Sequence, residues 1–446
     1  MDEEQLRAAR ERLRGRYGAA IADKASDDFC RAFGGEAELE GSAGEAIVEF
    51  DPEPAGAAPE ATAGAEAHAA IAALGGQHGL TLRTDLLLRQ ARITALRDDF
   101  YRAAGPIGAE FGAAPEEAGD AEYCWLNRTM RLPTVSTALA EVAADPRVRA
   151  VDVPLPMTPE LAVTTATVGA ANYRERGDRT GAGIIVAVID SEVALDHPYL
   201  RDRVIHRHNH VREPWGRPNP HGTGVAGIIA ASGEKLQGMA PAALLYTYKV
   251  FATDPLLRST DFDGALALEK ALEDGAHIAN CSWGVGPVGD GVSRIARACD
   301  TAWTAGMTVV KSAGNHPPGA TMVTAPAEAE GVIVVGGTNR AGTRLGSYSN
   351  FGPTPSGQAR PHLLAPGGVD GDGIVTCWTN GDVGAIGPGT SFAAPHVSGL
   401  LALILESRPQ LTPVQQRELL MTLCTPLATV DPARQGAGLL SLAGLA

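Results

Sequence analysis

Four polar side chains of this 446-residue sequence could act together on a carbonyl group: Asp190, His221, Asn315 and Ser391. A serine hydroxyl is a poor nucleophile until a base removes its proton, and a histidine base needs an acidic partner to fix its tautomer. A side-chain amide can donate a hydrogen bond to an oxygen that gains negative charge. The four residue types together indicate cleavage of an acyl bond through a serine nucleophile.

Each of these residues also has a simpler interpretation when it is taken alone. Asp190 in VAVIDSEVALDHP could cap a helix or form a surface ion pair, and His221 in HGTGVAGIIAA could be a capping or core histidine. Asn315 in KSAGNH could stabilise a turn. The hypothesis therefore depends on their combination.

The stretch GPGTSFAAPHVSGLLALILE, residues 387–406, predicts an apolar helix that opens beside Ser391. The N-terminus of a helix has unpaired backbone N–H groups and a positive partial charge, and both stabilise an oxyanion. The glycines let a substrate backbone approach closely, and Pro395 is expected at or near the first turn, where a missing N–H costs little.

The elements that position these residues are buried strands alternating with helices. Apolar runs over 183–190, 243–251, 276–284, 307–315 and 331–339 read as strands, with helices expected over 264–275 and 293–306. Such alternation predicts an α/β fold, with a parallel sheet covered by helices on both faces. Reactive groups collect at the carboxyl ends of such strands, where Asp190 and Asn315 are found.

The order Asp, His, Ser is the order of the triad in subtilisin. From about residue 160 to 446 the chain resembles the subtilisin-like serine proteases. The segments that carry the resemblance are VAVIDS, HGTGVAG, SAGN and GTSFAAPHVSG, with GMAPAALLYTYKV, NCSWG, TAPAEAEGVIVVGG, SYSNFGP and LLAPGG between them.

The resemblance implies a role for each matching residue. Asp190 would orient the base His221, Ser391 would be the nucleophile, and Asn315 with the Ser391 backbone N–H would form the oxyanion hole. An extended substrate would lie along Ser282, Trp283 and Gly284, as an added strand, and Trp283 would narrow the wall of the pocket. No cofactor is needed for this chemistry. Structural calcium is common in the family, but no acidic cluster identifies its ligands.

Two positions depart from the family pattern. Glu192 stands where a glycine usually follows Asp-Ser, and it is expected to face solvent, to favour basic substrate residues, or to mark a site that must rearrange. Gly224 stands where many members have a second histidine. That change leaves the base intact.

The N-terminal part is expected to form a helical extension over 1–43 and a small α+β domain over 44–157, ahead of a catalytic domain over 158–446. The order β-α-β-β-α-β, with 122–133 as one strand, indicates a ferredoxin-like domain. The stretch ALAEVAADPRVRAVDV resembles the propeptide domain that folds and inhibits subtilases. A cut between about Leu155 and Thr165 follows from that match.

Composition excludes some classes of protein. The formal charge of −15 argues against a nucleic-acid partner, and no apolar run is long enough to cross a membrane. The charged N-terminus lacks a signal-like apolar segment, which predicts a cytoplasmic protein. Six scattered cysteines without a C-x-x-C spacing are then expected to be reduced.

The function expected from the sequence is a serine endopeptidase that acts on proteins or peptides and is held as a zymogen by its own N-terminal domain. The alternative is a silent or activator-dependent scaffold that binds extended peptides. Ester hydrolysis of the α/β-hydrolase type is disfavoured because G-x-S-x-G is absent around Ser391. A metal-binding protein would need clustered ligands, which the sequence lacks.

Overall fold

The computed structural model describes most of the C-terminal two thirds of the chain and separate parts of the rest. The described residues are 3–27, 29–30, 46–50, a few positions between 93 and 104, 122–132, 142–152, 157–159, 167–170, 173–174, 179–254, 256–287, 292–315 and 323–445. The chain divides into two compact units, Met1–Leu155 and Pro156–Ala446.

Among its described residues, the first unit has the helices α1 and α2 and a small antiparallel sheet with the strand order β2-β3-β1-β4. The helices break at Gly18, whose φ of 94° lies in the left-handed region that favours glycine. Leu13 and Ile21 are buried, as their helical spacing predicts, and Ser26 N donates to Val151 O in β4. The elements are α1 (Glu3–Tyr17), α2 (Ala19–Lys24), β1 (Ala46–Phe50), β2 (Glu122–Cys124), β3 (Thr129–Leu132) and β4 (Val148–Asp152).

The expected single strand over 122–133 is a hairpin in the structure, which corrects that prediction. Strands β2 and β3 pair antiparallel, and the chain turns between them through Trp125–Arg128. Arg128 has a φ of 56°, and its carbonyl accepts from Phe50 N, so the turn is fastened to β1. The part of the expected β-α-β-β-α-β order that falls within residues 51–92 lies outside the described residues.

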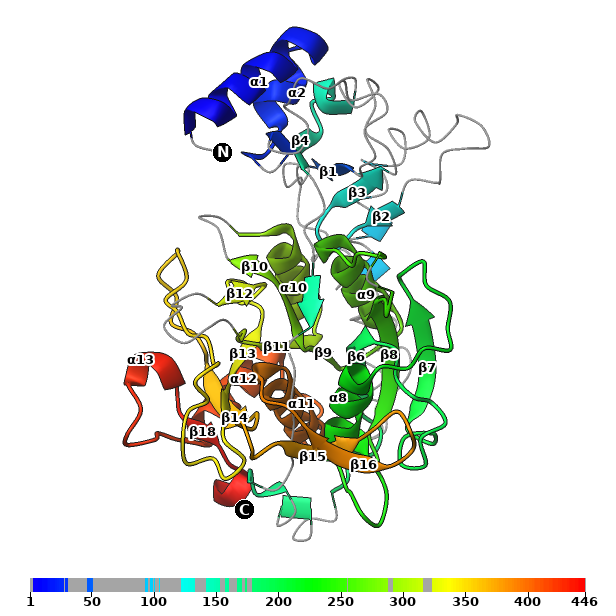
Figure 1. Ribbon diagram of the computed structural model, residues 1–446, viewed down its shortest axis with the longest axis vertical. Coiled ribbons are helices and arrows are strands. Elements are labelled where there is room, and N and C mark those ends of the chain that lie inside the picture. The colour runs from blue at the N-terminus through cyan, green and yellow to red at the C-terminus, as the bar shows by residue number, and fades with distance from the viewer. Residues whose placement is uncertain are drawn as a thin grey trace, which may run out of the picture. The chain divides into compact units, whose positions relative to one another are not determined.

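The second unit is built on a nine-stranded sheet with the order β17-β18-β14-β13-β11-β9-β6-β8-β7 (Figure 1). All neighbours in it are parallel except β17, which runs antiparallel to β18. Four of the five expected strands belong to this sheet, and the fifth, expected over 276–284, is divided: β9 lies in this sheet, whereas Trp283 and Gly284 begin β10 of a separate sheet. Its strands are β6 (Ile185–Ser191), β7 (Val204–Asn209), β8 (Leu244–Phe251), β9 (Ile278–Cys281), β11 (Thr308–Ser312), β13 (Ile333–Thr338), β14 (Leu363–Pro366), β17 (Cys424–Thr425) and β18 (Leu439–Leu440).

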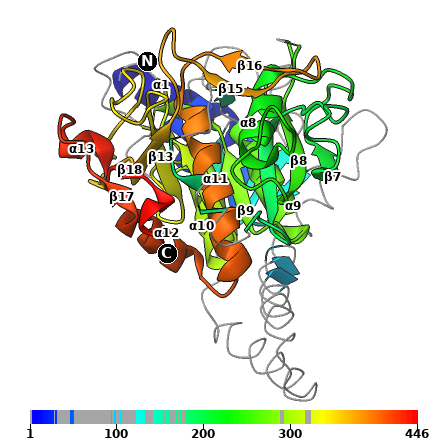
Figure 2. The same cartoon turned by 90° about the horizontal axis from the view of Figure 1, so that it is seen from below.

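Helices cover both faces of this sheet, as the alternation of strands and helices predicts. On one face α11 packs against α8 and crosses β9, β11 and β13; on the other α9 packs against α10. Figure 2 shows α11 running through the middle of the unit. The helices are α8 (Pro220–Ala230), α9 (Asp261–Glu273), α10 (Arg294–Thr304), α11 (Thr390–Ser407), α12 (Pro413–Thr422) and α13 (Pro432–Gln435), with a 3-10 turn, η1 (Leu442–Gly444).

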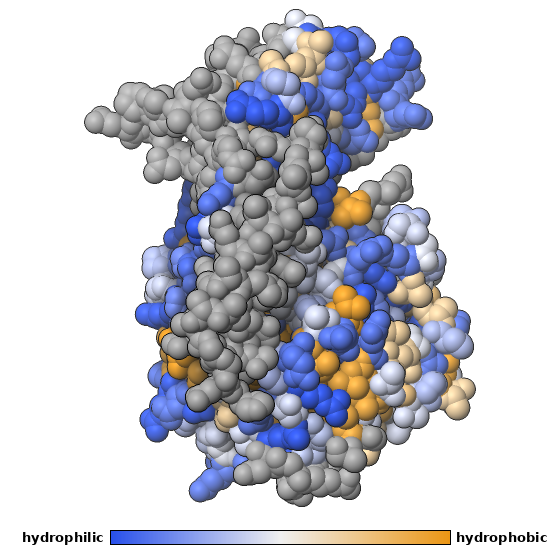
Figure 3. All heavy atoms as spheres, turned by 180° about the vertical axis from the view of Figure 1, so that it is seen from behind, coloured by the Kyte–Doolittle hydropathy of each residue, from blue (hydrophilic) through white to orange (hydrophobic). Residues whose placement is uncertain are grey.

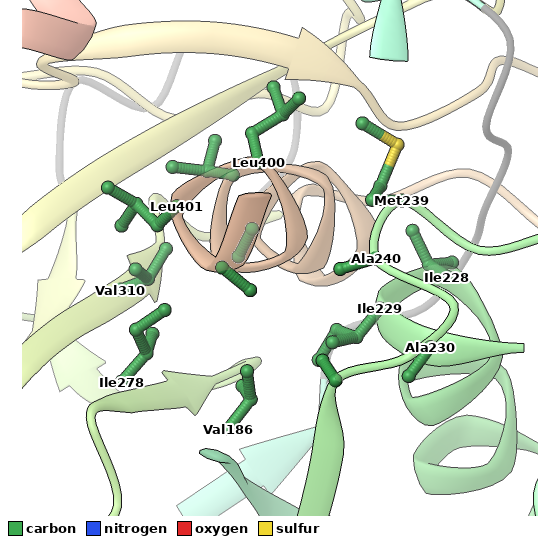
Figure 4. Close-up of a cluster of buried hydrophobic side chains, with 14 of the residues drawn as sticks. Val186, Ile228, Ile229, Ala230, Met239, Ala240, Ile278, Val310, Leu400 and Leu401 are labelled. Atoms are coloured by element: carbon green, nitrogen blue, oxygen red, sulfur yellow. The ribbon is translucent and has the colours of Figure 1, made fainter. Parts of the chain in front are cut away.

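The core lies between α11, α8 and the sheet. In Figure 4 Leu401 of α11 lies beside Val310, with Ile278 and Val186 on the neighbouring strands, whereas Leu400 lies on the opposite side of the helix; all five are fully buried. Burying one such side chain stabilises the fold by about 1.5–3 kcal/mol. The helix that carries Ser391 is therefore among the most firmly packed elements of the unit.

Two smaller sheets complete this unit. Strand β10 (Trp283–Pro287) lies between β5 (Met157–Pro159) and β12 (Thr324–Ala325), and it is antiparallel to both. A hairpin of β15 (Ile374–Cys377) and β16 (Val383–Ile386) leads into α11.

The described residues also show the character of the surface, the absence of a long apolar helix and the state of the cysteines. Hydrophilic residues make up much of the described surface in the view of Figure 3. Within the described part of the chain, no helix is long and apolar enough to cross a membrane. All six cysteines are free thiols, and five of them are buried.

Candidate active site

Asp190 is the penultimate residue of β6, at the carboxyl end of the sheet, and it is fully buried. Its Oδ1 accepts hydrogen bonds from Ser191 N at 2.7 Å and from Ser191 Oγ at 3.0 Å. A buried carboxylate needs such donors because an unpaired charge in the interior is costly. The side chain is thereby fixed toward the neighbouring helix α8.

His221 is the second residue of α8, and its Nδ1 lies 2.7 Å from Asp190 Oδ1. A carboxylate can only accept, so Nδ1 carries the hydrogen and Nε2 is left as the basic atom. Asn219 caps the helix by accepting from His221 N, and Pro220 occupies the first helical position. Gly222 is required here, because a Cβ would lie 2.4 Å from Ser191 O.

Ser391 is the second residue of α11, and its hydroxyl donates to Ser282 O at 3.1 Å. Ser282 Oγ in turn donates to Ser391 O. This carbonyl has no helical N–H to accept from, because Pro395 stands four residues later. Pro395 thus lies in the second turn rather than the first, and its missing N–H frees a carbonyl that ties the helix to Ser282.

His221 contacts the start of α11 through Phe392, the residue that follows Ser391. The His221 ring packs against Phe392, with 4.9 Å between ring centroids. The side chains of Ser391 and His221 are both buried, at 0% and 1% exposure. The structure therefore brings Asp190, His221 and the start of α11 into one cluster.

Asn315 follows β11 and is oriented by the residue before Ser391. Its Oδ1 accepts from Thr390 N at 2.7 Å and from Thr390 Oγ1 at 2.9 Å. With Oδ1 used in this way, the Nδ2 donor points away from Thr390. The arrangement suits an amide that donates to a substrate oxygen beside Ser391.

Trp283 and Gly284 begin β10, directly after Ser282, and an extended segment of the same chain already pairs with this strand. Met157–Pro159 runs antiparallel to it, with Pro159 opposite Trp283 and Thr158 opposite Gly284. The Trp283 side chain does not form a pocket wall, which corrects that expectation. It is fully buried, and its Nε1 donates to Ile189 O at 2.9 Å, so it points into the protein.

Comparison with known proteins decides the family of this chain. Residues 181–442 match the family described as Peptidase_S8, the subtilase family. The chain belongs to the subtilase family. Its curated relatives include the serine protease AprX of Bacillus subtilis (strain 168), 32% identical over 291 residues, and subtilisin BL of Lederbergia lenta, 33% identical over 259 residues. The fold and these relatives are those of subtilisin-like serine proteases.

These matches cover different shares of the two relatives. The AprX match covers 58% of this chain and 65% of AprX, and the subtilisin BL match covers 56% of this chain and 87% of that protein. The chain thus spans slightly less than two thirds of AprX.

Solved structures give the same fold. The prenylagaramide maturation protease PagA has a TM-score of 0.51 at 27% identity, over 61% of this chain and 96% of PagA. The epidermin leader peptide processing serine protease EpiP of Staphylococcus aureus has a TM-score of 0.58 at 22% identity, over 71% of this chain and 90% of EpiP.

Glu192 of this subtilase does not face solvent and is paired inside the protein, which corrects the expectations of a solvent-facing side chain and of a contact with basic substrate residues. It is 6% exposed, and its Oε2 accepts from Lys249 Nζ at 2.9 Å. Gly216 N and Arg217 N also donate to its carboxylate. The carboxylate of Glu192 is therefore paired inside the protein, with Lys249 and with the loop that leads into α8.

Lys249 joins Glu192 to a second buried carboxylate, Glu213, at 2.8 Å. Burial alone would raise the pKa of Glu213. The hydrogen bond from Lys249 and those from Thr253 N and Asp254 N outweigh that effect and lower the pKa to about 2. We call Glu192, Lys249 and Glu213 the ion cluster.

The other departure, Gly224, has a steric cause in this subtilase. A Cβ there would lie 3.1 Å from Thr376 Cγ2, and Thr376 Oγ1 donates to Gly224 O at 2.8 Å. The β15–β16 hairpin thus occupies the space that a histidine side chain would need.

Another histidine, His396, lies on α11 and is fully buried. Burial lowers its pKa to about 4, and its Nδ1 lies 2.6 Å from Phe392 O. It is therefore neutral near pH 7, and its contacts are those of a core residue. Among the residues that the structure describes, no group of three or more His, Cys, Asp or Glu side chains is placed to hold a metal.

Sequence reasoning missed the residues that position the site. They are Ser191, which binds Asp190, Asn219, which caps α8, and Thr390, which orients Asn315. Asn219-Pro220 could have been found, since Asn at the N-cap and Pro at the first position are typical of a helix start.

Proposed function

We propose that this subtilase is a serine endopeptidase whose reacting residues are Asp190, His221 and Ser391. The observation that carries the proposal is the 2.7 Å contact between Asp190 and His221, beside the helix start that holds Ser391. In this mechanism Nε2 of His221 takes the hydroxyl proton of Ser391 as Oγ attacks the peptide carbonyl. The proton then passes to the leaving amine, and water releases the acyl group from Ser391.

The negative charge of the intermediate falls on the former carbonyl oxygen. Asn315 Nδ2 and the N–H of Ser391, at the positive end of α11, are the donors that would stabilise it. The peptide would bind as an extended strand along β10, through backbone hydrogen bonds that do not depend on its sequence.

We further propose that the N-terminal unit restrains the enzyme. One observation supports this: Met157–Pro159, just after the end of the N-terminal unit at Leu155, occupies the edge of β10. A substrate strand needs the same edge, so it competes with this segment. Release would follow a cut after the segment, within the range from Leu155 to Thr165 that the sequence predicts.

A fluorophosphonate probe tests the proposal, because it reacts only with an activated serine. The full chain should be labelled at Ser391, and Ser391→Ala should remain unlabelled. Casein should be hydrolysed by the wild type alone. A folded wild type that is neither labelled nor active on casein would favour the alternative, a scaffold that binds extended peptides.

Intact-mass measurements test the proposed restraint by the N-terminal unit. Intact mass over time should show loss of an N-terminal fragment from the wild type but not from Ser391→Ala. A chain that stays intact while it hydrolyses casein would exclude an inhibitory N-terminal unit.

A further inference from the structure

Three buried polar side chains lie behind Ser391, and the mechanism above does not use them. Asn280 is in β9, Ser282 follows that strand, and Ser398 is in α11, seven residues after Ser391. All three are fully buried. A polar group in the interior costs free energy unless it is hydrogen-bonded, so each of these side chains needs a partner.

A chain of hydrogen bonds connects these side chains to the backbone of Ser391. Ser398 Oγ donates to Asn280 Oδ1 at 2.8 Å, and Asn280 Nδ2 donates to Ser282 Oγ at 2.9 Å. Ser282 Oγ in turn donates to Ser391 O. The chain of bonds therefore starts in the middle of α11, passes through β9 and returns to the first turn of the same helix.

The carbonyl of Ser391 fixes the direction of these hydrogen bonds. A carbonyl oxygen can only accept, so the one hydrogen of the Ser282 hydroxyl must point to it. Ser282 Oγ then accepts from Asn280, which requires the Nδ2 side of the amide to face Ser282. In the opposite amide orientation Asn280 Oδ1 would take the hydroxyl hydrogen, and Ser391 O would lose this donor.

Two hydrogen bonds join Ser391 to Ser282, and only one of them can persist during the proposed reaction. Ser391 Oγ donates to Ser282 O at 3.1 Å in the structure. In the mechanism this hydrogen passes to His221, so the bond breaks as Oγ attacks. The bond from Ser282 Oγ to Ser391 O involves none of the reacting atoms. It is therefore the contact that can hold the start of α11 while the acyl group forms.

Pro395 makes the side-chain donor from Ser282 important. Because Pro395 has no N–H, Ser391 O lacks the helical hydrogen bond that usually fixes the first turn of a helix. The Ser282 hydroxyl takes the place of that N–H. The position of the nucleophile thus depends on a side chain, and the direction of that side chain depends on Asn280.

We propose that Asn280 is a positioning residue for the nucleophile. By donating to Ser282 Oγ, it directs that hydroxyl to Ser391 O and so fixes Ser391 Oγ and the Ser391 N–H at the start of α11. Asn280 acts through Ser282 and not on the substrate. This inference rests on the proposed serine endopeptidase function, and it concerns the formation of the acyl group rather than the binding of the peptide.

Asn280→Ala should therefore lower the rate of the chemical step. Ser398 Oγ also donates to Ala394 O at 3.3 Å, so it keeps an acceptor in this variant. The Ser282 hydroxyl loses the donor that directs it. A displacement of about 1 Å in a reacting group can cost roughly 100-fold in rate. We expect kcat to fall roughly 10- to 100-fold, with KM close to that of the wild type.

A double-mutant cycle separates positioning from a general loss of packing. Fluorescein-labelled casein gives kcat and KM for Asn280→Ala, Ser282→Ala and the double variant, and the fluorophosphonate probe counts the active sites. If Asn280 acts through Ser282, the double variant should lose no more of kcat than Ser282→Ala alone. Losses that multiply, an unchanged kcat in Asn280→Ala, or a raised KM at constant kcat would each overturn the proposal.

Thr308→Val is the matched control. Thr308 is fully buried at the amino end of β11, and its Oγ1 donates to Gln416 Oε1 at 2.6 Å. The variant also removes one buried hydrogen bond, but at the end of the sheet opposite to Asn315. It should lower the urea midpoint, measured in the Ser391→Ala background, and leave kcat unchanged. An equal fall in kcat would assign the effect of Asn280→Ala to stability and overturn the proposal.

If Asn280→Ala does not fold, Ser282→Ala decides, because it removes a single hydroxyl. A wild-type kcat in Ser282→Ala would overturn the proposal, since Asn280 would have no residue through which to act. An active wild type whose kcat survives these changes would leave the proposed function intact. A folded wild type that is neither labelled nor active on casein would refute that function, and this inference with it.

Discussion

Two buried polar clusters lie on adjacent strands of the same sheet, and they differ in how completely their atoms are paired. Asp190 of β6 is directly opposite Lys249 of β8 in the strand register. In the ion cluster every carboxylate oxygen of Glu192 and Glu213 accepts at least one hydrogen bond. In the Asp190–His221 cluster, by contrast, Asp190 Oδ2 is buried and has no hydrogen-bond partner among the described residues.

The difference separates a structural cluster from a reactive one. A fully satisfied network rigidifies its surroundings, since any change in it leaves a buried group unpaired. In the proposed mechanism, the carboxylate of Asp190 would stabilise the positive charge that His221 gains when it takes a proton. Variants should therefore act mainly on rate in one cluster and mainly on stability in the other.

The largest effect is expected for Asp190→Asn. An amide can donate to Nδ1 of His221, so the hydrogen would move to Nε2 and the base would be lost. We expect kcat to fall about 10⁴-fold, as it does when this change is made in a Ser-His-Asp triad. Urea unfolding should change little by comparison. A variant with near wild-type kcat would remove Asp190 from the mechanism.

A large loss of stability is expected for Lys249→Met, because two buried carboxylates would then face each other without their cation. Breaking a buried ion pair in this way costs about 3–5 kcal/mol. Urea unfolding in a Ser391→Ala background avoids self-digestion, and the exposed Lys235→Met serves as the control. An unchanged midpoint would mean that the ion cluster does not stabilise the fold.

Asn315→Ala should affect rate with little effect on binding. The charge on the intermediate would lose one donor, and we expect kcat to fall about 100- to 1,000-fold, a range known for subtilisin and carried over to this relative. KM should stay close to that of the wild type. A rise in KM at constant kcat would instead assign Asn315 to ground-state binding.

The smallest effect is on the dependence of stability on pH. The pKa of Glu213 is lowered to about 2 in the folded chain from an ordinary value near 4.5. Its stabilising contribution is therefore fully present above about pH 4.5 and is lost as the pH falls toward 2. Glu213→Gln in the Ser391→Ala background should flatten the unfolding free energy over this window. Parallel curves for the two proteins would contradict this origin of acid sensitivity.

The elements of the second unit could be predicted from the sequence because periodicity and packing agree. Apolar runs such as 183–190 and 331–339 have no other stable place than a covered parallel sheet. Asp190, His221 and Ser391 could likewise be chosen as site candidates, because Asp190 ends a predicted strand and the other two lie at the starts of helices. Residues 122–133 were less predictable, because one backbone angle at Arg128 converts a strand into a hairpin.

The environment of Glu192 could not be predicted, since its partners are distant in sequence. Lys249 and Glu213 meet it only when β8 and the loop before α8 are in place. A charged residue after Asp-Ser has the same sequence appearance whether it faces water or a buried cation. The orientation of Trp283 was hidden for the same reason, because its partner is a backbone carbonyl of another strand.

The order of the two units along the chain also fixes the order in which the ribosome makes them. The first unit ends at Leu155, whereas Ser391 enters the chain roughly 240 residues later. At about 5–20 residues per second, a ribosome completes that unit roughly 10 to 50 s before it adds the nucleophile. Small domains fold well within such an interval. A nascent chain therefore completes its proposed inhibitor before it contains its proposed nucleophile, an order that would suit a protease restrained from the moment of its synthesis.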